Sequence, residues 1–163
     1  MIDRALGLGD RVFMAGVAAS MALVVAIVAA DVISRFVFGS SIIVSGELSR
    51  LGLVWMTFLV MPLGVSRGLH VAITSAVDPL PLPLRRAVFR IGTALVLALM
   101  GVVLAGAWIS IGARSYESLN TLPLTAAAFF WPVLLCAGWA IVHLTVQFVT
   151  GRAAERVTMG DLP

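Results

Sequence analysis

The stretch VFMAGVAASMALVVAIVAA, residues 12–30, contains no charged residue over 19 positions. A bilayer's hydrocarbon core is about 30 Å thick and needs about 20 helical residues to cross it, so this stretch has the length of one membrane span. Three further apolar segments follow at residues 51–66, 91–113 and 126–149. The chain is therefore expected to cross a membrane four times.

Composition supports the same fold class. Hydrophobic residues make up 61% of the 163 residues and charged residues only 12%, whereas soluble domains carry about 25% charged residues. The first segment is longer than a signal peptide's apolar region, and three more follow it, so a spanning helix is expected rather than a cleaved leader. The sequence predicts an all-α integral membrane protein with one domain over residues 1–163. Its four transmembrane helices, packed as a bundle or a splayed scaffold, are expected at about 12–36, 46–68, 88–113 and 125–149.

Arginine placement predicts the orientation, because cytoplasmic loops of membrane proteins are enriched in basic residues. All eleven basic residues are arginine. The side that would hold both termini has eight of them: Arg4, Arg11, Arg67, Arg85, Arg86, Arg90, Arg152 and Arg156. The other side has three: Arg35, Arg50 and Arg114. Both termini are thus expected in the cytoplasm. The arginines are scattered, which excludes a dense nucleic-acid-binding face and suits contact with membrane lipids.

Four charged residues lie close together in the sequence, around the connection between the first two helices. Asp31 and Arg35 are four residues apart and Glu47 and Arg50 three apart, so each pair shares a helix face. A charge at mid-bilayer costs about 2.5–3.5 kcal/mol, and less near the interface. We expect Arg35 to pair with Glu47 across the hairpin and so fix how the two helices dock.

Small residues predict where helices meet. In lipid, helices associate through close backbone approach at Gly and Ala. Two series follow a period near 3.5: Ala15, Ala19, Ala22, Ala26 and Ala29, and then Ala94, Ala98, Gly101 and Ala105. These faces are expected to contact another helix. Pro62 and Pro132 fall inside the second and fourth segments and are expected to kink them. The prolines at 79, 81 and 83 predict an extended connection before the third helix.

The residues show no nucleophile and base, no phosphate loop and no metal cluster, so neither an enzyme nor a cofactor is expected. Two alternatives remain from the residues alone. Asp31 or Glu47 could be the coupling carboxylate of a self-contained, proton-coupled transporter. His70 and His143, on different helices, could instead ligate haem in a membrane anchor subunit of a respiratory enzyme, although their expected depths differ.

Several motifs, in this order and spacing over about residues 12–149, resemble a known family. They are DVISRFVF (31–38), ELSR (47–50), VSRGLHV (65–71), LPLRR (82–86) and SLNTLP (118–123), followed by FWP (130–132). The pattern is similar to that of the Q-type small membrane subunit of tripartite ATP-independent periplasmic (TRAP) transporters, in the bacterial inner membrane.

The resemblance implies a specific role. In that family a periplasmic binding protein captures an organic anion, often a carboxylate, and a large multi-helix membrane subunit carries it inward with sodium. The small subunit supports the large one and binds neither substrate nor sodium. The residues with structural or partner-interface roles are then expected to be Asp31, Arg35, Glu47, Arg50, Arg67, His70 and Pro123.

Overall fold

A computed structural model describes residues 2–66 and 81–150. Its elements there are all helical: α1 (Ile2–Phe38), α2 (Ser45–Ser66), α4 (Leu82–Arg114), the short 3-10 helix η2 (Ala126–Phe129) and α5 (Trp131–Thr150). The four long helices are each apolar and long enough to cross a membrane. The predicted all-helical class and four candidate spans are therefore confirmed.

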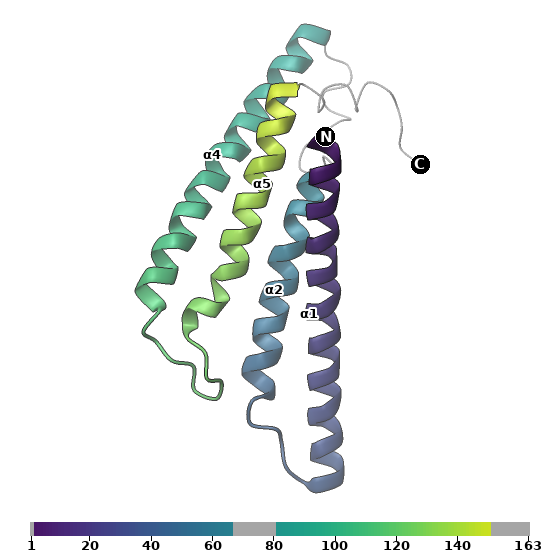
Figure 1. The fold of residues 1–163 in the computed structure, drawn as a ribbon, viewed down its shortest axis with the longest axis vertical. Coiled ribbons are helices and arrows are strands. Elements are labelled where there is room, and N and C mark those ends of the chain that lie inside the picture. Colours follow the sequence, from purple (N-terminus) through teal and green to yellow (C-terminus); the bar gives the residue numbers. More distant parts are fainter. Residues whose placement is uncertain (1, 67–80, 151–163) are drawn as a thin grey trace.

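The four long helices form a splayed layer (Figure 1). Their order across the layer is α4, α5, α2 and α1, and the extensive contacts are those of α5 with α4, α5 with α2, and α2 with α1. The connections 39–44 and 115–125 lie at one end of the layer, hereafter the loop end. The start of α1 and the end of α5 lie at the opposite, terminal end.

Helix α5 is the best-buried of the four. Ala137, Ala140 and Leu144 have no exposed surface, and Leu144 packs in a cluster with Val65 of α2 and Met100 of α4. Alanines at the contact let neighbouring backbones approach closely, which is how helices gain dispersion energy in lipid. The residues that remain exposed are mostly large and apolar, as expected for a surface that faces hydrocarbon.

The contact between α1 and α2 uses glycine rather than the alanine series. A Cβ added at Gly52 would lie 2.6 Å from Val24 Cγ2, and one added at Gly16 would lie 2.9 Å from Leu59 Cδ1. Every member of both predicted small-residue series is exposed instead. The expectation that those faces meet a helix is therefore wrong for the helices of this chain that the structure describes.

Three helix boundaries differ from the sequence prediction. Helix α1 begins at Ile2, well before residue 12. Helix α4 begins at Leu82, so the predicted extended connection is wrong from that residue onward; Pro81 is its N-cap, and a proline in the first turn costs no helical hydrogen bond. Pro132 is the second residue of α5, after η2, so it helps to start a helix and does not kink one.

We predict that Gly52→Ala destabilises the protein by about 1–3 kcal/mol, because Val24 is β-branched and cannot easily turn away. The matched control is Gly106→Ala in α4, where a Cβ would meet nothing within 4 Å. That control should be neutral or stabilising by up to about 1 kcal/mol, since alanine is the better helix former. Thermal unfolding in detergent measures both variants, and equal effects would contradict the close contact assigned to Gly52 between α1 and α2.

Candidate functional site

The first polar site closes the hairpin between α1 and α2. Asp31, only 8% exposed, accepts hydrogen bonds from Arg35 Nη2 (2.8 Å), Ser41 Oγ (2.7 Å) and the backbone N–H of Ile42 (2.7 Å). Gly39 has φ +69°, the left-handed conformation in which glycine is favoured, and it ends α1. Asp31 therefore holds the connection 39–44 against the end of α1.

The second polar site lies where the connection 115–125 approaches α2. Glu47, in the first turn of α2, accepts hydrogen bonds from the backbone N–H groups of Asn120 (3.0 Å), Thr121 (2.9 Å) and Leu122 (3.1 Å), and from the Thr121 hydroxyl (2.6 Å). Successive N–H groups that converge in this way form an anion-binding concavity. The Glu47 carboxylate fills it and joins the two hairpins.

The expected pair of Arg35 with Glu47 is wrong. Arg35 instead bonds to Asp31 on its own helix, and Glu47 bonds to residues more than 70 positions away. A carboxylate surrounded by three backbone N–H groups and a hydroxyl gains more hydrogen bonds than a single exposed arginine could supply.

Two other arginines at the loop end lie against aromatic rings. Arg50 Cζ is 5.8 Å from the ring centroid of Phe129, and Arg114 Cζ is 5.6 Å from that of Phe130. Arg114 also contacts Glu117 at 3.1 Å. The cation–π geometry places these two arginines over η2 and the residue that follows it, while Pro123 is exposed in the connecting loop.

A third polar site, at the α1–α5 contact, was not foreseen from the sequence. Asp10 Oδ1 accepts the indole N–H of Trp139 (2.9 Å) and lies 2.9 Å from Nε2 of His143. His143 is only 6% exposed. Gly9 lets this contact form, because a Cβ there would overlap the Trp139 indole. The sequence signal was His143, a polar residue inside the apolar segment 126–149, whereas Asp10 precedes the predicted first span.

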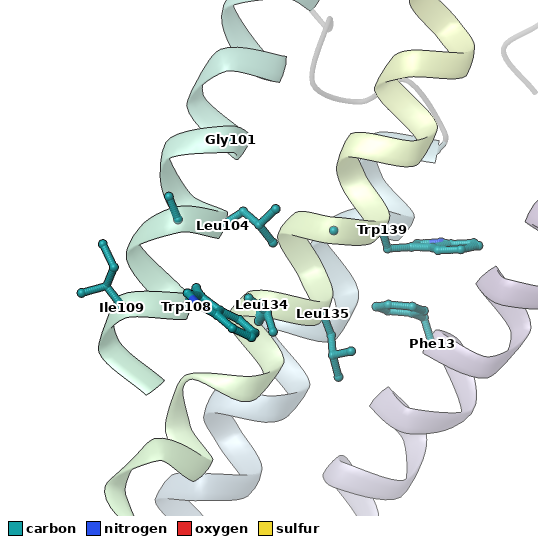
Figure 2. A pocket seen from close by; sticks show the side chains of 10 residues that line it. Phe13, Gly101, Leu104, Trp108, Ile109, Leu134, Leu135 and Trp139 are labelled. Atoms are coloured by element: carbon teal, nitrogen blue, oxygen red, sulfur yellow. The ribbon is translucent and has the colours of Figure 1, made fainter. Parts of the chain in front are cut away.

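A largely apolar cavity of about 820 Å³ lies between α4 and α5 and reaches α1 (Figure 2). Leu104 and Trp108 of α4 line one side, and the stacked rings of Phe13 and Trp139, 5.6 Å apart, line the other. Its lining offers little hydrogen-bonding chemistry. No group of three or more metal-ligating side chains occurs within residues 2–66 and 81–150.

Two of the expected interface residues, Arg67 and His70, lie outside the described residues. The structure brings together Glu47 and the loop that contains Pro123, and it joins Asp31 with Arg35. It does not bring these two groups into one ion-pair network. Each group of hydrogen bonds separately stabilises one connection at the loop end.

Comparison with known proteins supports the family resemblance that the sequence motifs indicated. The family model "Tripartite ATP-independent periplasmic transporters, DctQ component" matches residues 24–154. A Haemophilus influenzae (strain ATCC 51907 / DSM 11121 / KW20 / Rd) protein named as a TRAP transporter small permease protein is 27% identical over 106 residues. The alignment covers 63% of this chain and 65% of the relative, slightly less than two thirds of the relative's length.

Replacing Glu47 by glutamine should release the loop 120–122. A carboxamide has one acceptor oxygen, and its NH₂ group would face backbone donors. We expect faster hydrogen exchange at the amides of Asn120, Thr121 and Leu122 and a lower melting temperature. In the control, Glu117→Gln removes only an exposed ion pair with Arg114 and should leave these amides protected. Unchanged exchange in Glu47→Gln would refute the role assigned to the carboxylate.

Proposed function

Because the chain belongs to the family of DctQ components of tripartite ATP-independent periplasmic transporters and is a small permease subunit, we propose that it is a non-catalytic scaffold. In this proposal it supports the large membrane subunit of a sodium-coupled transporter, which takes an organic anion, chemically a carboxylate, from a periplasmic binding protein. The transporter lies in the bacterial inner membrane, with the loop end of this chain facing the periplasm.

The proposal rests on the hydrogen bonds of Asp31 and Glu47, the two carboxylates that the sequence suggested as coupling sites. Asp31 accepts three hydrogen bonds and Glu47 accepts four, all from this chain. A coupling carboxylate must release and rebind a cation or a proton, and each cycle would have to break the connections that these groups hold. Their geometry favours permanent structural roles.

One observation favours the rival function, a self-contained proton-coupled transporter. Asp10 and His143 both lie within candidate spans, and ionisable residues inside a membrane often mark proton pathways. The pair also has a structural explanation, because Asp10 accepts hydrogen bonds on its Oδ1 that join α1 to α5. The two functions therefore need a direct test.

We expect the tagged chain to co-purify from detergent with a large multi-helix membrane protein. Deletion of its gene should abolish uptake of the transporter's organic anion and leave unrelated uptake systems unchanged. The physical reason is that a mobile transport domain needs a fixed partner in the membrane. Pull-down with mass spectrometry and radiolabelled uptake at high and low external sodium measure these two results.

Reconstitution of the chain alone in liposomes is the control for that experiment. It should move neither protons nor organic anions across the membrane. Proton movement that depends on substrate and disappears in Asp10→Asn, Asp31→Asn or Glu47→Gln would instead establish the rival function. A stable chain without a large partner, together with normal uptake in the deletion strain, would contradict the scaffold role.

Orientation is testable by thiol labelling, because the single native cysteine, Cys136, is only 3% exposed and should stay unreactive. Tyr116→Cys places a thiol where the side chain is 93% exposed at the loop end. A membrane-impermeant maleimide should label it in cells with a permeabilised outer membrane. Leu84→Cys, at a position that is 49% exposed near the start of α4 and outside the candidate span Ala87–Arg114, should react only after the inner membrane is opened. The reverse pattern would invert the proposed topology.

A further inference from the structure

A polar cavity of about 490 Å³ opens beside the α1–α2 hairpin at the loop end. Its polar lining comes from Asp31, Arg35, Ser41, Ser45 and Ser49, and α2 begins at its edge with Ser45 and Gly46. In a chain with only 12% charged residues, this is an unusual concentration of hydrogen-bonding groups. The site is distinct from the Glu47 site and does not depend on the proposed function.

The groups still available in this cavity are mainly hydrogen-bond donors. Arg35 uses Nη2 for Asp31 and Ser41, whereas its Nη1 and Nε have no partner among the described residues. Its side chain is 64% exposed. The Ser49 hydroxyl and the Gly46 backbone N–H likewise have no partner in the described part of the chain, whereas the Ser45 N–H already donates to the carbonyl of Ile42. Free donors beside a guanidinium fit an oxyanion.

The cavity also changes in polarity along α1. Val28 and Ile43 line it together with the polar residues, and their side chains are 46% and 82% exposed. Val28 precedes Arg35 by seven residues, which places it about 10 Å further along the helix, away from the loop end. A ligand that fills the whole cavity therefore has a charged part at Arg35 and an apolar part beside Val28.

Asp31 limits the charge that the ligand can carry. Its carboxylate lies in the cavity wall beside Arg35, so the local formal charge is near zero, and a dianion would be repelled at short range. A phosphodiester carries a single negative charge and three or more acceptor oxygens. Free inorganic phosphate is a mixture of monoanion and dianion near neutral pH, and it has no apolar part to contact Val28.

From the cavity, its free donors and its polarity gradient, we propose that this hairpin is a phospholipid-binding site. The phosphodiester head group of a lipid in the leaflet at the loop end accepts hydrogen bonds from Arg35 and Ser49. One acyl chain runs along α1 beside Val28. The site thus fixes a lipid at the end of the hairpin where the connection 39–44 meets the membrane.

Native mass spectrometry tests the proposal on the full chain, purified in detergent and titrated with a short list of defined probes. They are phosphatidylglycerol, phosphatidylethanolamine, a diacylglycerol without phosphate, and inorganic phosphate. We expect one phospholipid to bind with saturation. Arg35→Gln should weaken it about tenfold or more, as expected for a hydrogen bond to a charged group, while diacylglycerol and inorganic phosphate bind poorly.

Two further variants separate lipid binding from general effects. Ser49→Val replaces the free hydroxyl by an apolar group and leaves the bonds of Asp31 in place, so it should lower lipid affinity while the melting temperature stays unchanged. Arg114→Gln is the matched control, because Arg114 is also a half-exposed arginine paired with an acid at the loop end, and it should bind lipid as the wild type does. The proposal is overturned if Arg35→Gln and Arg114→Gln lose affinity equally, or if Ser49→Val binds lipid normally. It is also overturned if inorganic phosphate binds as strongly as phospholipid, or if no phospholipid is retained.

Discussion

The arrangement of this chain depends on the contact between the Glu47 carboxylate and three successive backbone amides of the loop before η2. At a membrane boundary, irregular backbone must satisfy its own N–H groups or lie in water. Glu47 does so from the first turn of α2, so the same bonds that satisfy the loop also join the two hairpins. Trp55 adds a second link, donating its indole N–H to the carbonyl of Ala128 at 3.1 Å.

The terminal end is joined by similar means. Gln147 of α5 donates to the carbonyl of Val65 in α2 (3.0 Å), and Asp10 of α1 accepts from Trp139 and lies beside His143 of α5. Because lipid gives apolar helices little reason to associate, these polar links and the close approach at Gly16 and Gly52 specify the packing. The result is a layer with α5 inside it and α1 at one edge, which leaves broad apolar faces for lipid or for other protein.

The sequence was sufficient for the number of spans and insufficient for their contacts. Charge-free length is a local property and is dictated by bilayer thickness, so the four candidate spans followed directly. Helical spacing also placed Asp31 and Arg35 on one face, although the predicted partner of Arg35 was Glu47 and the observed one is Asp31. The partner of Glu47 did not, because 74 residues separate it from Thr121, and spacing within a helix says nothing about which loop arrives beside it.

Helix faces were misjudged for a related reason. Alanine and glycine both allow close approach, and the alanine series on α1 has as regular a period as the face containing Gly9, Gly16 and Ser20. What distinguishes the second face is that Asp31 lies on it and Asp10 lies beside it, and both have protein partners in the fold. A charge on a spanning helix points toward protein more reliably than a stripe of small side chains does.

Acids and arginines are used differently in the described part of the chain. Asp10, Asp31 and Glu47 are directed to backbone or side-chain donors of the protein itself, whereas Arg35, Arg50 and Arg114 keep exposed side chains at the loop end. A carboxylate that already accepts three or four hydrogen bonds has few lone pairs left to coordinate a transported cation. These three acids therefore hold the fold together, whereas Glu117 forms only an exposed pair with Arg114. The three arginines keep part of their side chains free for contacts at the membrane surface. This division fits the scaffold role proposed above, in which the subunit has no transport site of its own.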